Sequence, residues 1–127
     1  MALHLLDTNI LIHVLRGEER CVSLVMRLVD AGHTLATCGV VVAEVYAGMR
    51  AKDAEKTRLL VSSLEWLELS QAGAERAGLM RRDSSAKGVS LSLADCLIAA
   101  IGIESQAILV TENVKDFPAK ELLVLAV

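Results

Sequence analysis

The chain has 127 residues, of which 54% are hydrophobic and 23% charged, with a single proline. This composition excludes a disordered or collagen-like chain, and the length is enough for one core, so we expect residues 1–127 to form a single domain. The net charge of −3 argues against a protein that coats nucleic acid with a basic surface, although it does not exclude a nuclease whose metal ions supply positive charge.

Neither a membrane segment nor a targeting segment is recognisable. No apolar run approaches the ~20 residues that cross a bilayer, and the N-terminus lacks the basic flank and cleavage site of a signal peptide. We therefore expect a cytoplasmic protein. The three cysteines, Cys21, Cys38 and Cys96, are scattered and odd in number, which favours buried thiols in a reducing compartment over disulfides or a zinc site.

The first half of the chain alternates short apolar runs with helical patterns. An apolar run ends at Asp7, and the small polar residues Thr8 and Asn9 suit a junction from strand to helix. Further along, apolar side chains recur at helical spacing up to Gly32. These patterns predict strands at residues 2–6 and 34–38, and helices at residues 9–15, 18–31 and 40–49.

The second half continues the alternation. Its patterns predict helices at residues 53–64, 72–82 and 92–105, strands at 67–69, 107–111 and 121–127, and a loop at 84–90. Strands that alternate with helices predict an α/β fold, a three-layer α/β/α sandwich around a mostly parallel sheet of four to five strands. Sites in such sheets form beyond the carboxyl ends of the strands, where we expect Asp7 and Asn113.

Four acids are candidate site residues, and three have a plain structural alternative. Asp7 suits an N-cap, and Asp95, three residues after Ser92, resembles part of a capping box. Asp116 suits a turn before a proline. Glu44 is harder to explain, because it is the only charge between residues 40 and 49; we expect it to be buried, and therefore paired, protonated or bound to a metal.

The four acids together favour a metal site over four separate caps. Two carboxylates ~4 Å apart repel by about 4 kcal/mol at an effective dielectric constant of ~20, so a cluster of four needs cations. Oxygen ligands without cysteine or histidine suit Mg²⁺ or Mn²⁺. His4, His13 and His33 stand in no recognisable constellation, and the motifs of serine hydrolases and of common nucleotide-binding loops are absent.

Four segments carry a resemblance that extends over essentially the whole chain: LLDTNILI, VVAEVYAGM, LSLADCLIAA and LVTENVKDF. With this order and spacing, the sequence resembles PIN-domain ribonucleases, specifically the VapC-type toxins of VapBC toxin–antitoxin pairs. The resemblance implies a PIN-like fold and a Mg²⁺- or Mn²⁺-dependent endoribonuclease in which metal-bound water attacks the phosphodiester. It assigns catalytic and metal-binding roles to Asp7, Glu44 and Asp95.

The fourth position of the implied site falls in TENVKDF. Family members can carry an acid where this chain has Asn113, so the resemblance implies that Asp116 supplies the fourth carboxylate and that Asn113 serves as an oxygen ligand or hydrogen-bonding partner. The missing charge leaves open whether one metal ion binds or two. Thr8, Asn9 and Thr111 are supporting residues. The hydroxyls of Thr8 and Thr111 suit the orientation of carboxylates or of bound water, or equally the capping of a helix or turn.

The resemblance also implies partners. RNA would be held by basic rather than aromatic side chains, since Tyr46, Trp66 and Phe117 are the only aromatic residues. The candidates for this contact are Arg16, Arg50, Lys52 and Lys87, each of which can also be an ordinary solvated charge. Family likeness further implies a homodimer and a VapB-type antitoxin that inserts a segment into the acidic site.

Two other functions remain open from the sequence. A phosphotransfer domain would use Asp7 as phosphoryl acceptor, but such enzymes usually need a second aspartate two residues later, where this chain has Asn9. An inactive PIN-like module that serves only in protein or RNA binding is the other alternative. Asn113 is the one residue that favours it, and the retention of Asp7, Glu44 and Asp95 argues against it.

Overall fold

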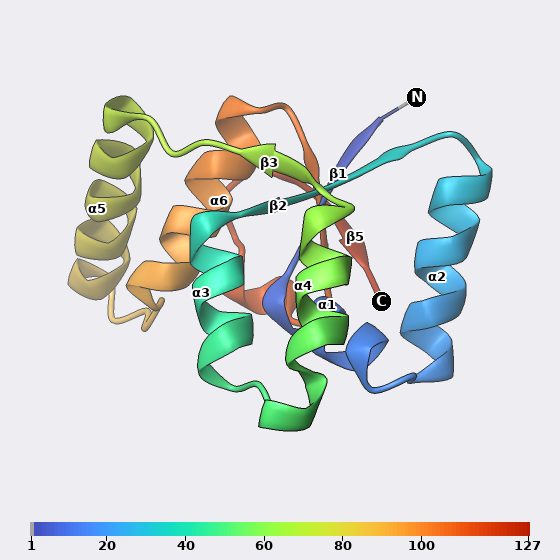
Figure 1. The fold of residues 1–127 in the computed structure, drawn as a ribbon. Helices are drawn as coiled ribbons and strands as arrows, with labels where there is room; N and C mark the ends of the chain where they lie inside the picture. Colours follow the sequence, from blue (N-terminus) through green and yellow to red (C-terminus); the bar gives the residue numbers. More distant parts are fainter. Residues whose placement is uncertain (1) are drawn as a thin grey trace.

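The computed structural model describes residues 2–127, which form a central sheet between helices (Figure 1). The strands are β1 Leu3–Leu6, β2 Thr34–Cys38, β3 Glu65–Leu67, β4 Ile108–Thr111 and β5 Leu123–Ala126. The α-helices are α1 Thr8–Leu15, α2 Glu19–Asp30, α3 Gly39–Ala47, α4 Ala54–Ser62, α5 Gln71–Ala86 and α6 Leu93–Glu104, with short 3-10 helices η1 Ala51–Asp53 and η2 Val114–Asp116. Figure 1 shows α2 on one side of the molecule and α5 beside α6 on the other.

All five strands are parallel and lie in the order β3-β2-β1-β4-β5. Central strand β1 pairs on both sides, with Leu5 opposite Ala36 of β2 and Leu109 of β4. The chain builds the sheet outward from β1 in one direction through β2 and β3, then returns to the other side of β1 with β4. The gap between the carboxyl ends of β1 and β4 is therefore the switch point, where open parallel sheets bind their ligands.

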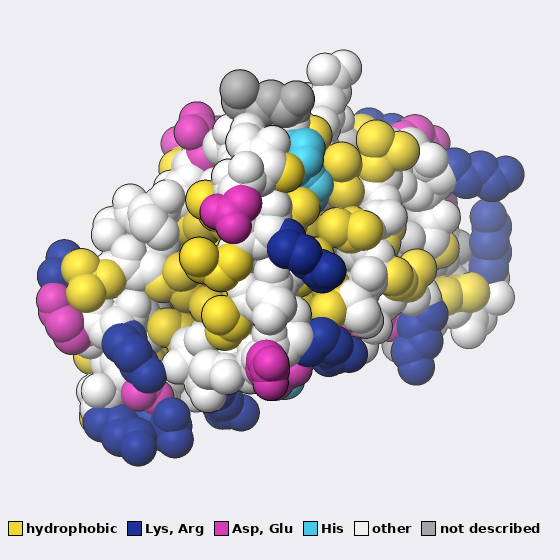
Figure 2. Space-filling view, turned by 90° about the vertical axis from the view of Figure 1, so that its right-hand side faces the viewer, with side chains coloured by type: hydrophobic (Ala, Val, Ile, Leu, Met, Phe, Trp, Pro, Cys, Tyr) yellow, Lys and Arg dark blue, Asp and Glu magenta, His cyan; other side chains and the backbone are white. Residues whose placement is uncertain are grey.

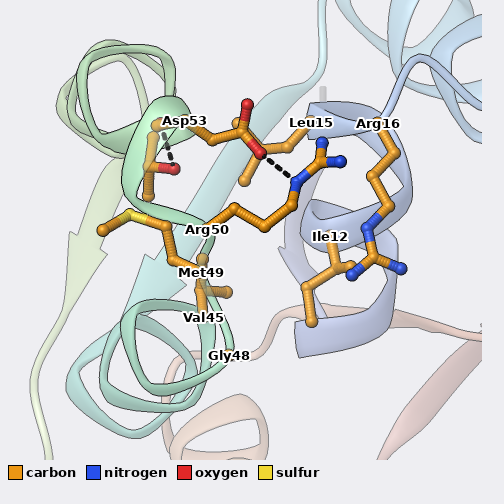
Figure 3. Close-up of a pocket in the computed structure, with 9 residues that line it drawn as sticks. Ile12, Leu15, Arg16, Val45, Gly48, Met49, Arg50 and Asp53 are labelled. Atoms are coloured by element: carbon orange, nitrogen blue, oxygen red, sulfur yellow. Dashed lines mark hydrogen bonds and ion pairs between the residues drawn. The ribbon is translucent and has the colours of Figure 1, made fainter.

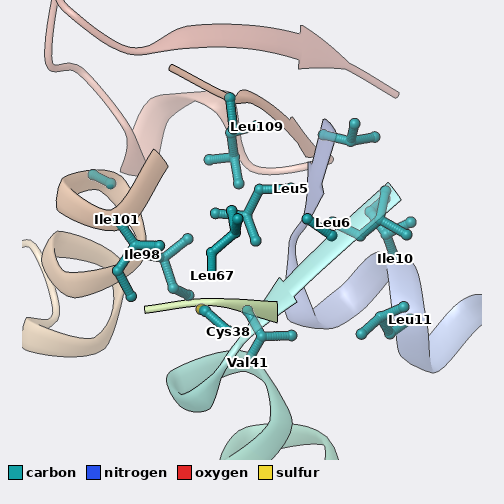
Figure 4. Packing of buried hydrophobic residues seen from close by; sticks show 14 of the residues in the cluster. Leu5, Leu6, Ile10, Leu11, Cys38, Val41, Leu67, Ile98, Ile101 and Leu109 are labelled. Carbon is teal, nitrogen blue, oxygen red and sulfur yellow. The ribbon is translucent and has the colours of Figure 1, made fainter. Parts of the chain in front are cut away.

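The core lies where the sheet meets α1 and α6. Leu5, Ile10, Leu11, Ile98 and Leu109 are completely buried there. Figure 4 shows Leu109 beside Leu5, Ile98 beside Ile101 on α6, and Ile10 of α1 near Leu6. Truncation of such a leucine to alanine typically costs 2–5 kcal/mol of unfolding free energy, so this core fixes how β1, β4 and the two helices meet. It also fixes the position of any side chain at their ends.

The expected α/β/α architecture is confirmed, and two element boundaries differ. The third strand lies at Glu65–Leu67 rather than at 67–69, because the residues that pair with Ala36–Cys38 decide its position. Helix α5 continues through Ser84 to Ala86, where we expected a loop. The Ser84 hydroxyl donates to the Arg81 carbonyl within the helix, and the turn that ends α5 comes at Gly88, whose φ of +76° favours glycine.

The three cysteines are buried and form no disulfide, as the sequence indicates. None of the helices in the described chain has the length and apolar character that a membrane span requires.

Candidate active site

Asp7 stands directly after β1 and is 5% exposed. Both of its carboxylate oxygens accept a hydrogen bond: Oδ1 from the Thr8 backbone N–H at 2.8 Å, and Oδ2 from the Thr111 hydroxyl at 2.7 Å. The first bond makes Asp7 the N-cap of α1, so the structural role expected from the sequence is real. The second bond joins the ends of β1 and β4, and it fixes the carboxylate at the switch point of the sheet.

Glu44 is connected to Asp7 through Thr8. The Thr8 hydroxyl donates to Glu44 Oε1 at 2.7 Å, so one residue holds one acid with its backbone and another with its side chain. Our expectation that Glu44 is buried is wrong: Glu44 is exposed, as are its neighbours Ala43 and Tyr46. Helix α3 has more apolar residues than it buries, so some of them are exposed beside Glu44. A single charge in an apolar helix was therefore a false indication of burial.

Asp95 lies in the first turn of α6, and Ser92 is the N-cap of that helix. The Ser92 hydroxyl accepts from the Asp95 backbone N–H at 3.0 Å, which is half of the expected capping box. The Asp95 side chain is partly buried. Capping is thus carried out by the Ser92 hydroxyl and not by the Asp95 carboxylate.

Asn113 and Asp116 occupy different positions relative to the acids. Asn113 joins the network through its backbone, whose N–H donates to the Thr111 hydroxyl oxygen at 3.0 Å. Asp116 lies in η2, the turn that follows, and its backbone N–H donates to the Asn113 carbonyl at 3.0 Å. Asp116 is half-buried and carries the charge that Asn113 lacks. This arrangement favours Asp116 as the fourth carboxylate.

The four acids influence one another electrostatically. The pKa of Asp7 is raised above its usual value, first by burial and then by repulsion from Glu44 and Asp116, although hydrogen bonds from Thr111 and Thr8 oppose the shift. The pKa of Asp95 is also raised, first by burial and also by repulsion from Asp7, Asp116 and Glu44, although a hydrogen bond from Ser92 opposes the shift. Acids from β1, α3, α6 and η2 therefore lie within electrostatic range of one another.

The donor set suits a divalent cation, although it is not closed around one. Within residues 2–127, no three histidine, cysteine, aspartate or glutamate side chains are close enough to enclose an ion. The candidates offer only hard oxygen ligands, and their mutual repulsion is the kind that a cation relieves. The residues that could hold it are Asp7, Glu44, Asp95 and Asp116.

Two of the basic candidates share a small pocket between the C-terminal parts of α1 and α3. Arg16 and Arg50 line it from opposite sides, as Figure 3 shows. Arg50 donates to Asp53 Oδ2 at 2.7 Å, whereas no ion pair of the described residues involves Arg16. Ile12 lines the same pocket one helical turn after Thr8, so the pocket lies along α1, close to the end of the helix that carries Asp7 and Thr8.

The remaining predicted residues are dispersed. Lys52 is exposed in η1, and Asn9 is exposed on the first turn of α1 with no side-chain hydrogen bond in the described chain. Lys87, at the end of α5, lines a cavity together with Asp95 and Asp116. The structure therefore brings Lys87 to the acids and leaves Asn9 outside their network.

Two neighbouring charges were not predicted. Lys115 lines the same cavity as Lys87, and its place next to Asp116 in the sequence is the signal that would have found it. Glu112, between Thr111 and Asn113, lies 2.8 Å from His13 Nε2 and accepts from Arg20 at 2.5 Å. We expected His13 to have no orienting partner, and this ion-pair network shows that it has one, outside the acidic group.

The family model and the similar proteins of known name point to the same family. The model of the PIN domain family matches residues 4–121. Ribonuclease VapC19 of Mycobacterium tuberculosis is 31% identical over 114 residues, which cover 90% of this chain and 91% of the relative. Ribonuclease VapC2 of Rickettsia felis is 28% identical over 120 residues, 91% of this chain and 90% of the relative.

Solved structures agree with the sequence comparison. The crystal structure of VapBC2 from Rickettsia felis bound to a DNA fragment from its promoter matches with a TM-score of 0.85 and 25% identity, covering 98% of both chains. A toxin–antitoxin complex from Klebsiella pneumoniae matches with a TM-score of 0.74 and 28% identity, covering 97% of this chain and 96% of that one. The chain described here belongs to the PIN domain family, among its VapC-type members.

Proposed function

We propose that this chain is an endoribonuclease that hydrolyses RNA phosphodiester bonds with the help of Mg²⁺ or Mn²⁺, as the toxin of a type II toxin–antitoxin pair. The observation that carries the proposal is Asp7, held at the switch point by Thr8 and Thr111 in a chain 31% identical to a named VapC ribonuclease. In this proposal Asp7, Glu44, Asp95 and Asp116 are the metal ligands.

The residues of the chain prepare this site before any ligand binds. Since both Asp7 oxygens accept a hydrogen bond, its carboxylate cannot rotate freely. Thr8 sets the position of Glu44 relative to Asp7. The chemistry that bound Mg²⁺ or Mn²⁺ supplies here is neutralisation of phosphate charge and activation of a water molecule. Such fixed orientation of the ligands reduces the reorganisation needed during reaction.

Asp7 is less suited to accept a phosphoryl group. Phosphotransfer enzymes of this kind usually carry a second aspartate two residues after the acceptor, and that position is Asn9, which is exposed and outside the hydrogen bonds around Asp7. The phosphotransfer alternative therefore has no observation in its favour. The inactive-module alternative is decided by the activity assay below.

The experiment is cleavage of a mixed RNA pool by the purified protein with Mg²⁺ or Mn²⁺, compared with the Asp7→Asn variant. We expect cleavage by the wild-type chain only. The matched control is Asp30→Asn, the same change at an exposed residue that ends α2. Equal inertness of the wild-type chain and Asp7→Asn across RNAs and metals would replace the proposal by the inactive binding module.

A VapB-type antitoxin is the proposed partner, and an apolar groove supports it. The groove has a volume of about 500 Å³ and lies between α2 and α4, where Val25, Val29, Leu60 and Leu64 line it. Figure 2 shows several exposed apolar side chains on this side of the molecule, with charged side chains among them. An exposed apolar groove of this kind suits an amphipathic helix of a partner. Basic residues from the antitoxin would suit the acidic site.

A homodimer is the second proposed assembly. Large apolar side chains are exposed on helices away from the groove: Tyr46 of α3 is 40% exposed, Leu79 of α5 48% and Leu93 of α6 51%. Contact between two copies would cover such side chains. Light scattering of the purified chain tests this; a monomer at micromolar concentration would contradict it.

A further inference from the structure

A cavity of about 450 Å³ adjoins the acids on the side of α5. It lies between the end of α5, the start of α6 and the segment that follows η2, and both Asp95 and Asp116 line it. The volume is within the range of sites that hold small ligands. The cavity and the candidate active site are therefore continuous, and they share two carboxylates.

The floor of the cavity is apolar. Leu91, Cys96, Ala99 and Phe117 line it and are at most 9% exposed, and Pro118 extends the same surface. An apolar floor next to a site for a phosphate suits a flat ring more than a second charged group.

The rim of the cavity carries two lysines and one acid, Asp83, whose carboxylate is paired with Arg82. Lys87 and Lys115 are both exposed and line the opening, and no ion pair of the described residues involves either of them. Two unpaired cations beside an acidic group, in a chain with a net charge of −3, are complementary to phosphate. An apolar side chain from a protein partner would fill the floor but would leave these charges unmatched.

We infer that this cavity is a subsite for RNA: it receives the base of a nucleotide adjacent to the cleaved phosphodiester, while Lys87 and Lys115 contact the phosphates beside it. The inference rests on the proposed ribonuclease function. It adds the path that the RNA strand takes beyond the candidate active site. Ring contact with the apolar floor and charge contact at the rim are the two terms that usually hold single-stranded RNA.

The test uses the shortest RNA that the wild-type chain cuts at one mapped bond, and copies of it with a single abasic nucleotide on either side of that bond. The variant Ser84→Leu places a larger side chain in the cavity from a position on α5. Ser85→Leu is the matched control, because Ser85 is exposed and does not line the cavity. Thermal unfolding verifies that both variants are folded.

We expect one abasic position to lower kcat/KM about tenfold, and Ser84→Leu to lower it about tenfold on intact RNA. On the RNA that lacks that base, Ser84→Leu should cause no further loss, because the contact is already absent. Ser85→Leu should cleave as the wild-type chain does. Lys87→Ala should flatten the dependence of RNA binding on salt concentration, and Lys120→Ala, outside the cavity, should not.

Three results would overturn the inference. If Ser84→Leu and Lys87→Ala cleave intact RNA at the wild-type rate, the cavity is no RNA subsite, although the ribonuclease function stands. If Ser84→Leu weakens binding of the antitoxin and leaves RNA cleavage unchanged, the cavity receives a protein side chain. If the wild-type chain cleaves no RNA, the proposed function fails, and this inference fails with it.

Discussion

Asp7 and Asp53 are both buried, with 5% and 9% of their surfaces exposed, but their surroundings are opposite. Asp53 is paired with cations: Arg50 Nε lies 2.7 Å from it and Lys56 Nζ 3.7 Å. The hydrogen bond from Arg50, followed by the charges around it, lowers the pKa of Asp53. Asp7 has no cation within ion-pair distance in the described chain, and burial raises its pKa.

The presence or absence of a cationic partner distinguishes an acid that stabilises the fold, Asp53, from an acid that suits ligand binding, Asp7. The charge of Asp53 is neutralised within the chain, because Arg50 and Lys56 pair with it between α3 and α4. Asp7 has hydroxyl and N–H donors, which orient its carboxylate, but its neighbouring charges are acids. Burial of an acid among acids lowers stability, and such sites are usually functional. Four predictions test this contrast.

The largest expected effect is stabilisation by metal. A cation that binds the folded chain only adds about 2.7 kcal/mol to its unfolding free energy at a hundred times the dissociation constant. We expect Mn²⁺ to raise the melting temperature of the wild-type chain and of Asp53→Asn alike, and to have little effect on Asp7→Asn. Differential scanning calorimetry with and without Mn²⁺ measures this. An equal rise in all three proteins would show that the ion binds elsewhere.

The second effect concerns the hydroxyl that holds Asp7. Thr111→Val removes the 2.7 Å bond to Asp7 Oδ2, and we expect RNA cleavage to fall by about 10- to 100-fold, as is typical when a residue that orients a metal ligand is lost. Thr57→Val is the control, since the Thr57 hydroxyl donates to the Asp53 carbonyl at 2.8 Å, away from the acids. Thr57→Val should lose stability and retain cleavage. Similar losses of cleavage in both variants would contradict the contrast.

The third effect is on stability at the ion-paired acid. Because the pKa of Asp53 is lowered by folding, its contribution is present above the pKa of an unfolded aspartate and is lost as the pH falls through the lowered value. Asp53→Asn should therefore be less stable than the wild-type chain at neutral pH, and the gap should close in acid. Urea denaturation across this pH range measures the gap. A gap of constant size would mean that the charge of Asp53 contributes nothing.

The smallest effect has the opposite sign. The raised pKa of Asp7 means that its favourable contribution is present below the pKa of an unfolded aspartate and is lost as the pH rises through the raised value. In chelator and at neutral pH, Asp7→Asn should be about 1 kcal/mol more stable than the wild-type chain, since asparagine also caps helices well. This gain should vanish in acid. If Asp7→Asn were less stable than the wild-type chain at neutral pH, Asp7 would be a structural acid like Asp53.

Much of this arrangement could be predicted from the sequence. Apolar runs gave the parallel strands, and the rule that parallel strands end at one edge brought Asp7 to the residues that follow β4. The same reasoning found Asp95, because an acid at the head of the most buried helix must lie near the sheet. Short-range patterns carry this information, since period and capping are local properties.

Other features depend on packing that no local pattern contains. Glu44 is exposed because α3 packs with only part of its apolar surface, and the sequence does not show which part. The choice between Asn113 and Asp116 depends on η2, whose turn places the acid. Lys115 became a candidate only when α5 and α6 formed a cavity beside it, across many residues of chain.

The hydrogen bond from Thr111 to Asp7 spans 104 positions in the chain, which has a consequence during translation. Asp7 is made 104 positions before its partner on β4, and the acid on η2 follows that partner. A growing chain can fold its early helices but cannot complete the pocket until β4 enters the sheet. The order of synthesis therefore places the completion of this pocket after β4 has been made.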